Sequence, residues 1–169
     1  MHHGEAVHTA YFALGTNLGD RAENLRRAVA ALRERFEITA LSPTYETEPA
    51  YQLDQPRFYN QCGRATTALS SQDTLAHLKH AEATLGRVPG VRFGPRLIDL
   101  DLLFYDDLVL ESDELQLPHP LLHERAFVLV PLNDIAPDLM HPTLSMTVGE
   151  LLGQLPDAER RKVWPIQPA

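Results

Sequence analysis

Hydrophobic and polar residues follow two different periods along the chain. In some segments apolar residues recur at every second position, as in β-strands, and in others at every third or fourth position, as in amphipathic helices. These periods predict strands over residues 8–14, 38–47, 58–69, 96–105 and 108–110, and helices over residues 20–35, 70–86 and 147–155. The apolar run over 127–135 contains Pro131 and fits either a helix or a strand. Because strands and helices are mixed without regular βαβ alternation, the pattern favours an α+β domain with a largely antiparallel sheet.

Residues with special backbone preferences mark several boundaries of these elements. Asp20 with Glu23, and Thr147 with Glu150, have the spacing of a helix capping box. Pro43 lies inside one predicted strand, and a proline is tolerated only at a sheet edge or a bulge. That strand is therefore expected at an edge of the sheet or with a bulge.

The predicted helix over 70–86 carries a carboxylate on its apolar side. Leu75, Leu78 and Leu85 mark the buried stripe of this helix, and Glu82 lies on the same stripe. A carboxylate in that position must find a partner or face a cavity, unless it reaches water from the edge of the stripe. The sequence alone leaves both readings open.

Length and composition indicate one ordinary globular domain. The chain has 169 residues, of which 44% are hydrophobic and 22% are charged. We expect a flexible N-terminal tail over residues 1–8 and a single domain over residues 9–165. The single cysteine of the sequence, Cys62, is consistent with a reducing compartment. No apolar stretch approaches the ~20 residues of a membrane span. The N-terminus lacks the pattern of a secretory signal. We therefore expect a cytoplasmic protein with no membrane partner, and we take it to be a monomer.

Two acidic residues stand two positions apart in the strongest predicted strand. Alternation places Asp99 and Asp101 on one face, about 6.6–6.8 Å apart between their Cα atoms. The same alternation places Leu97, Leu103 and Tyr105 beside the acids, and Ile98, Leu100, Leu102 and Phe104 on the opposite face. Two carboxylates that face the same way repel each other unless a cation lies between them, and Mg²⁺ typically uses one or two carboxylates together with substrate phosphates. The alternative is an exposed strand face with two solvated acids, which the apolar neighbours disfavour.

A cluster of arginines immediately precedes this strand. Arg87, Arg92 and Arg96 occur with no acidic residue among them in a chain of net charge −8. That net charge disfavours nonspecific binding to nucleic acid, but it does not exclude a local site for a small anion. Each arginine alone is equally well explained as a solvated surface group. His119 and His123 are four residues apart, but prolines interrupt that segment, so a shared metal on one helix is disfavoured.

These residues together are what phosphoryl transfer requires. Paired acids can hold a hard cation, and fixed cationic side chains can stabilise the charge that develops on phosphate oxygens. Glycine-rich phosphate loops that end in Gly-Lys-Ser/Thr, dinucleotide-binding glycine motifs and zinc motifs are absent from the sequence.

One octet, Gly94-Pro95-Arg96-Leu97-Ile98-Asp99-Leu100-Asp101, resembles the signature of the 6-hydroxymethyl-7,8-dihydropterin pyrophosphokinase family of folate biosynthesis. Further blocks follow in the order of that family, at residues 13–18, 45–49, 54–60, 82–87, 117–120, 123–127 and 131–137. The resemblance covers nearly the whole chain between residues 11 and 142, and the ordered set is far more specific than the octet alone.

The resemblance implies a single α+β domain of α/β/α layers, in which a ferredoxin-like, mostly antiparallel sheet carries helices on both faces. It implies transfer of the pyrophosphoryl group of ATP to the hydroxymethyl oxygen of the reduced pterin, with release of AMP. By this likeness Asp99 and Asp101 hold two Mg²⁺ ions, and the catalytic residues are Arg87, Arg92, Arg96, Asp99 and Asp101. ATP is expected to contact Glu82, Arg87, Arg92, Arg96, Ile98, His119 and Arg125, and the pterin to contact Thr47, Pro49, Phe58, Asn60 and Phe127.

The family pattern changes the reading of three residues. Phe58 and Phe127 are expected to sandwich the pterin ring, and Asn60 is expected to read its amide-like edge. From the residues alone, both aromatic side chains would be assigned to the core, and Asn60 to a turn or a sheet edge. A flat polar heterocycle does need aromatic faces and convergent polar groups, so the two lines of reasoning are compatible.

The sequence departs from the family pattern at two positions. The loop over 86–92 has a proline near the place where members often carry a further arginine, and Pro120 follows His119 where some members have an aromatic residue. Fewer cations, or a different geometry, are therefore expected over the phosphates. The loops over 48–57 and 87–93 are rich in polar residues, proline or glycine, and we expect both to be mobile when empty and to close over substrates.

Two other function classes remain open on the sequence. Paired acids with arginines also suit a metal-dependent nuclease or phosphatase, although the acidic net charge disfavours nucleic acid as a substrate. A ferredoxin-like scaffold also serves noncatalytic regulatory modules that bind small molecules, because a fold does not determine a function. Such a module would need no metal-binding acid pair.

Overall fold

In the part of the chain that the structure describes, six strands form the main sheet and two short strands form a separate pair. The computed structural model describes residues 6–51, 53–86 and 97–166. In chain order the elements are β1 (His8–Thr16), α1 (Arg21–Leu32), β2 (Glu37–Leu41), β3 (Tyr45–Thr47), β4 (Phe58–Thr67), α2 (Ser71–Thr84), β5 (Asp99–Tyr105), β6 (Leu110–Glu111), β7 (Gln116–Leu117), the 3₁₀ turn η1 (Leu122–Glu124), α3 (Ala126–Ile135), α4 (Val148–Gln154), α5 (Asp157–Arg160) and β8 (Val163–Pro165).

The strands of the main sheet run in the order β5-β1-β4-β3-β8, and β2 also pairs with β4. Every strand pairing among the described residues is antiparallel. The succession of β1, α1, β2 with β3, β4, α2 and β5 is the β-α-β-β-α-β arrangement of ferredoxin-like folds. The predicted α+β class with a mostly antiparallel sheet is confirmed, and β5 ends one side of the sheet in the described part.

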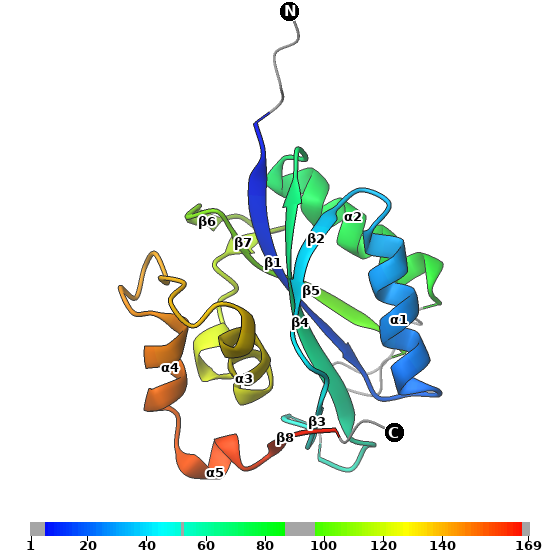
Figure 1. The fold of residues 1–169 in the computed structure, drawn as a ribbon, viewed down its shortest axis with the longest axis vertical. Coiled ribbons are helices and arrows are strands. Elements are labelled where there is room, and N and C mark those ends of the chain that lie inside the picture. Colours follow the sequence, from blue (N-terminus) through cyan, green and yellow to red (C-terminus); the bar gives the residue numbers. More distant parts are fainter. Residues whose placement is uncertain (1–5, 52, 87–96, 167–169) are drawn as a thin grey trace, which may run out of the picture.

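Helices cover both faces of this sheet (Figure 1). Leu25 and Ala28 of α1 and Leu78 of α2 pack against the inner residues of β1 and β5 in one apolar cluster. Leu129 and Leu132 of α3, together with residues of α4, form a second cluster on the opposite face. The layered arrangement predicted from the resemblance is therefore confirmed. None of the described helices has the length and apolar composition needed to cross a bilayer.

Both predicted helix N-caps are present in the structure, whereas the lengths of several predicted elements differ from the observed ones. The side chain of Asp20 accepts a hydrogen bond from the backbone N–H of Glu23 at 3.1 Å, and Thr147 with Glu150 forms a complete capping box. The helix predicted over 20–35 ends at Leu32, and the run over 127–135 is the helix α3. The first strand continues through Thr16, and the strand predicted over 108–110 overlaps the short β6 only at Leu110.

The strand predicted over 38–47 is divided into two strands at the proline, for which an edge position or a bulge was expected. It forms β2 and β3, and residues 42–44 lie between them. The hydroxyl of Ser42 accepts the backbone N–H of Cys62 at 3.0 Å, and the N–H of Ser42 donates to the carbonyl of Cys62 at 2.9 Å. Ser42 thus maintains pairing with β4 at the point where Pro43 has no N–H to offer.

The buried stripe of α2 differs from the predicted one. Leu78 is fully buried, but Leu75 and Leu85 are only partly buried at the margin of the core. Smaller and polar residues occupy the rest of the buried face, and Glu82 among them is only 3% exposed. The reading in which Glu82 reaches water from the edge of the stripe is therefore wrong.

A β-bulge changes the second half of β5. The pairing between β1 and β5 shifts by one residue between Tyr11 and Phe12, so Leu103 has no partner on β1. Because a one-residue insertion exchanges the two faces of a strand, Phe104 packs in the α3 layer and Tyr105 in the α1 layer. The prediction that Phe104 shares a face with Leu100, and Tyr105 with the acids, is wrong for this reason.

Candidate active site

Three neighbouring strands arrange the candidate residues in rows across the face that α3 covers. Gly15 of β1 lies opposite Asn60 of β4 on one side and opposite Asp99 of β5 on the other. Ala13, two residues earlier, pairs in the same way with Asp101. Adjacent strands are about 4.8 Å apart, so the Cα atoms of Asp99 and Asn60 are separated by about 10 Å. The acid pair and the buried amide therefore face one shared region.

The two acids are close enough to influence each other. Burial, followed by repulsion from Asp99, raises the pKa of Asp101 to about 6, and Glu82 adds to this effect. Lys79 and Arg125 act in the opposite direction and favour the ionised carboxylate. Both acids are only partly exposed. The protein therefore holds two like charges together in a partly desolvated place, which an added cation would stabilise.

The residues present suit a hard divalent cation. Among the described residues no group of three or more His, Cys, Asp or Glu side chains is arranged to hold a metal. Two carboxylates on one strand face suit Mg²⁺, because this ion commonly takes one or two protein carboxylates and completes its octahedron with water and phosphate oxygens. The donor set therefore fits the expected metal and does not resemble a closed structural site.

The backbone between the two acids is held from α2. The carboxylate of Glu82 accepts the N–H of Leu100 at 2.7 Å, and the Nζ of Lys79 donates to the carbonyl oxygen of Leu100 at 3.1 Å. Lys79 and Glu82 also pair with each other at 3.3 Å. The buried carboxylate of Glu82 thus has its partners on the strand and on its own helix, and it satisfies a strand edge that would otherwise lack a hydrogen-bonding partner.

The segment before α3 supplies a histidine and an arginine to the same region. Burial, together with the positive charge of Arg125, lowers the pKa of His119 to about 4, so its ring is neutral near pH 7. The backbone N–H of His119 donates to the carbonyl of Leu103 at 3.0 Å, which attaches this segment to β5. The Nε of Arg125 donates to the hydroxyl of Tyr51 at 3.0 Å, and its guanidinium lies 5.5 Å from the ring centre of Phe127.

Of the expected pterin residues, Thr47 lies on β3, Phe58 and Asn60 on β4, and Phe127 at the start of α3. The Nδ2 of Asn60 donates to the hydroxyl of Thr47 at 2.7 Å, and both residues are buried. A Cβ placed on Gly15 would lie 2.8 Å from the Oδ1 of Asn60 and 3.8 Å from the ring of Phe58. The side chain of Asn60 thus lies over Gly15, and its hydrogen bond to Thr47 fixes the orientation of its amide. Pro49 is buried just after β3.

The structure brings most, though not all, of the expected residues together. Glu82, Asp99, Asp101, His119 and Arg125 share one electrostatic neighbourhood. Ile98 is not part of it, because its side chain is buried in the α1 and α2 layer. The expected residues Arg87, Arg92 and Arg96, and the loop over 87–93, lie outside the described residues.

Two residues of the site were missed from the sequence. Lys79 stands three positions before Glu82 on one helix, a spacing that identifies a salt-bridged pair and could have indicated it. Tyr51 lies in the polar loop over 48–57, and nothing in the sequence singles out its hydroxyl as a partner for Arg125.

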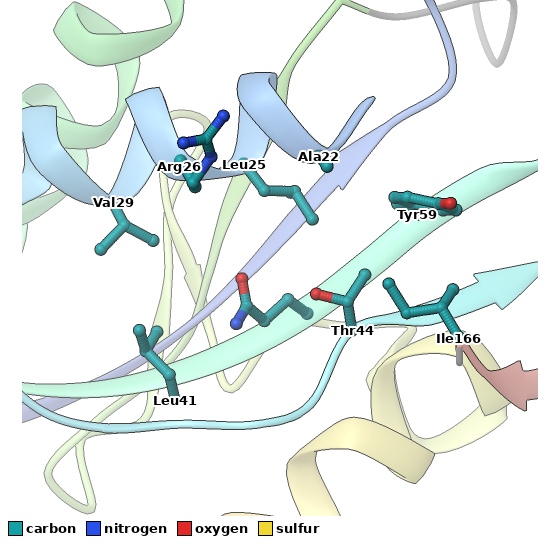
Figure 2. Close-up of a pocket in the computed structure, with 9 residues that line it drawn as sticks. Ala22, Leu25, Arg26, Val29, Leu41, Thr44, Tyr59 and Ile166 are labelled. Atoms are coloured by element: carbon teal, nitrogen blue, oxygen red, sulfur yellow. The ribbon is translucent and has the colours of Figure 1, made fainter. Parts of the chain in front are cut away.

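A separate pocket of about 310 Å³ lies on the other face of the sheet, between α1 and the strands β2 and β4 (Figure 2). Leu25 and Val29 of α1 face Leu41 and Tyr59 across it, and Ile166 closes one end. None of the expected site residues that the structure describes lines this pocket. It belongs to the face opposite the acid pair.

Comparison with known proteins gives a consistent result. The family model described as 7,8-dihydro-6-hydroxymethylpterin-pyrophosphokinase matches residues 11–137. The 2-amino-4-hydroxy-6-hydroxymethyldihydropteridine pyrophosphokinase of Synechocystis sp. is 38% identical over 97% of this chain and 83% of its own length. The protein of the same name from Bacillus subtilis is 42% identical over 75% of this chain and 77% of its own length.

Longer proteins also match. The folic acid synthesis protein FOL1 of Dictyostelium discoideum is 42% identical over 87% of this chain, and the chain spans 22% of that protein. A crystal structure of HPPK-DHPS from Plasmodium falciparum superposes with a TM-score of 0.71 at 18% identity, covering 89% of this chain and 46% of the other. At this identity the likeness supports the fold alone.

Proposed function

The chain belongs to the 7,8-dihydro-6-hydroxymethylpterin-pyrophosphokinase family, and we propose that it transfers the pyrophosphoryl group of ATP to the hydroxymethyl oxygen of 6-hydroxymethyl-7,8-dihydropterin in folate synthesis. The products are AMP and the pterin diphosphate. Two relatives that carry the name of this activity are covered by the chain over 83% and 77% of their length, which supports the assignment. The bond between the hydroxymethyl oxygen and the β-phosphorus of ATP forms as the bond from that phosphorus to the oxygen of AMP breaks, and the hydroxyl proton is released to solvent.

The pterin is proposed to bind against Asn60. The hydroxyl of Thr47 fixes the Asn60 amide, so that its remaining N–H and its oxygen can pair with the amide-like edge of the ring. Phe58, on the same face of β4, and Phe127, at the start of α3, are the proposed aromatic surfaces for the two faces of the ring. A fixed amide discriminates strongly, because a ligand that lacks the matching groups leaves buried polar atoms without partners.

The nucleotide is proposed to lie along β5. Arg125 and His119 are placed beside the acid pair, and Arg87, Arg92 and Arg96 are proposed to engage the phosphates. The neutral ring of His119 can donate one hydrogen bond and accept another, but at neutral pH it adds no charge. Asp99 and Asp101 are the residues that would hold two Mg²⁺ ions, which when bound would neutralise phosphate charge and lower the pKa of a coordinated hydroxyl.

The row formed by Asp99, Gly15 and Asn60 across three strands is the observation that carries this proposal. It places the Cα atoms of Asp99 and Asn60 about 10 Å apart, a separation comparable to the length of a two-ring heterocycle with a hydroxymethyl arm. The acceptor oxygen would therefore reach the acids when Asn60 holds the far edge of the ring. The site thereby supplies positioning and charge stabilisation, and among its described residues none stands out as a general base.

The decisive assay measures AMP with and without the pterin. We expect AMP and the pterin diphosphate to appear in equal amounts, and only when ATP, Mg²⁺ and the pterin are all present. AMP or inorganic phosphate formed without the pterin would instead indicate a phosphatase or nuclease. Absence of any metal-dependent affinity for a nonhydrolysable ATP analogue would favour a regulatory module. The monomeric state, the cytoplasmic location, the domain limits and the loop closure expected from the sequence stay predictions.

A further inference from the structure

The outer edge of β5 carries an arrangement that the proposed reaction does not yet use. β5 ends the sheet in the described part, so every second peptide group of this strand points away from β1. At Leu100 both outward groups are occupied by side chains of α2. Glu82 accepts the N–H at 2.7 Å, and Lys79 donates to the carbonyl oxygen at 3.1 Å.

This contact matters because it lies between the two candidate metal ligands. Leu100 is the residue between Asp99 and Asp101, and its own side chain is fully buried in the opposite layer. Its peptide groups therefore join the backbones of both acids, and any rotation of that segment turns the two carboxylates relative to each other. A metal site with only two protein ligands depends on the direction in which each ligand points.

We propose that Lys79 is a positioning residue for the pyrophosphoryl transfer: together with Glu82 it holds the peptide groups of Leu100 and thereby fixes the relative direction of Asp99 and Asp101 toward divalent cations. This inference rests on the proposed function. Lys79 acts through the strand and does not need to touch either substrate. Glu82 is itself expected near the nucleotide, so Lys79 is the more informative residue to change.

A second lysine in an ion pair of the same spacing serves as a control, although its acid partner Glu159 is 44% exposed and Glu82 only 3%. Lys162 and Glu159 are also three residues apart, with a separation of 3.2 Å and a lysine side chain that is 44% exposed. Lys79 is 46% exposed. The two lysines therefore match in type, spacing and exposure, but only Lys79 adds a hydrogen bond to the backbone of a strand that carries the acids. An exposed pair by itself contributes little to stability.

The experiment compares Lys79→Met with Lys79→Arg and with the control Lys162→Met. Binding of a nonhydrolysable ATP analogue is measured by calorimetry over a series of Mg²⁺ concentrations and also without metal. For Lys79→Met we expect the Mg²⁺ concentration at half-saturation to rise about tenfold, the magnitude typical of lost support behind a metal ligand. Lys79→Arg should restore most of this loss, and Lys162→Met should match the wild type.

Two further readouts distinguish positioning from other effects. Amide hydrogen exchange at Leu100 should accelerate in Lys79→Met by more than at other positions of the sheet. Thermal unfolding measures the general loss of stability separately, which is expected because the buried Glu82 carboxylate loses its lysine partner. Metal-free affinity for the analogue should be unchanged. A Mg²⁺ midpoint in Lys79→Met equal to that of the wild type would overturn the inference.

An equal loss of affinity with and without Mg²⁺ would also overturn it, because Lys79 would then contact the nucleotide directly. If the wild type itself shows no Mg²⁺-dependent binding of the analogue, the proposed function fails and this inference fails with it. The two failures are thus distinguished by the wild-type titration alone.

Discussion

A single added methyl group at Gly15 should impair the proposed pterin site. A Cβ at this position would lie 2.8 Å from the Oδ1 of Asn60, where ordinary contacts begin at 3.4 Å. β1 cannot move aside easily, because it is paired along its length with β4 and β5. The side chain of Asn60 must therefore turn, and in doing so it loses its 2.7 Å hydrogen bond to Thr47.

The size of the effect follows from the bonds that are lost. Breaking one buried side-chain hydrogen bond costs about 1 kcal/mol of folding stability. A turned amide also leaves the polar edge of the pterin without a partner, which costs about 1.5–3 kcal/mol of binding, or about a 10- to 100-fold rise in Kd. Gly15→Ala should therefore weaken pterin binding far more than it destabilises the fold, and ATP-analogue affinity should change little.

The assay is equilibrium binding of the pterin, followed by its fluorescence, together with thermal unfolding. Gly153→Ala is the matched control, because a Cβ at Gly153 meets nothing within 4 Å. A double variant sharpens the test. If Gly15→Ala acts through Asn60, then adding it to Asn60→Ala should cause no further loss of affinity. Wild-type affinity in Gly15→Ala, or additive losses in the double variant, would refute the reasoning.

Three other outcomes are expected. Asp101→Asn should reduce turnover by about three orders of magnitude or more. Its unfolding free energy at neutral pH should equal or exceed that of the wild type, because the substitution removes repulsion from Asp99. A clear loss of stability would contradict this. Burial, with a smaller effect of His123, lowers the pKa of His141. The contribution of His141 to stability should therefore be complete above about pH 6.5 and decline as the pH falls below that value. In denaturant unfolding over the same pH range, His141→Asn should show a flatter stability profile, since the asparagine oxygen can still accept the N–H of Thr143. Burial raises the pKa of the fully buried Cys62 thiol. A thiol reagent should therefore modify Cys62 no faster than the protein unfolds and exposes it. Fast labelling of the native protein would contradict the structure.

Local patterns accounted for much of the fold. The caps at Asp20 and Thr147 could be identified because each depends on residues only three positions apart. Pro43 marked its strand as irregular because it lacks an N–H, but the full break between β2 and β3 was not predicted. By contrast, the bulge opposite Tyr11 and Phe12 is a property of the pairing between β1 and β5. Periodicity within one strand carries no information about an extra residue relative to its partner, so the faces of Phe104 and Tyr105 were assigned wrongly.

The site was predictable to a similar degree. The acid pair is visible in the sequence because both carboxylates lie on one strand. The orientation of Asn60 is not visible, since it depends on Thr47 from β3 and on the space above Gly15 of β1. The same holds for the contact between Lys79 and the carbonyl of Leu100, which joins a helix to a strand edge that is 21 residues away. Contacts of this kind arise only when the layers pack.

A crystal structure with the pterin, a nonhydrolysable ATP analogue and Mg²⁺ tests the central claim most directly. We expect the pterin ring between Phe58 and Phe127 with its polar edge on Asn60. The β-phosphate of the analogue should lie beside Asp99 and Asp101, with the hydroxymethyl oxygen facing that phosphate. Binding of either substrate on the opposite face of the sheet, or acids that point away from both ligands, would contradict it.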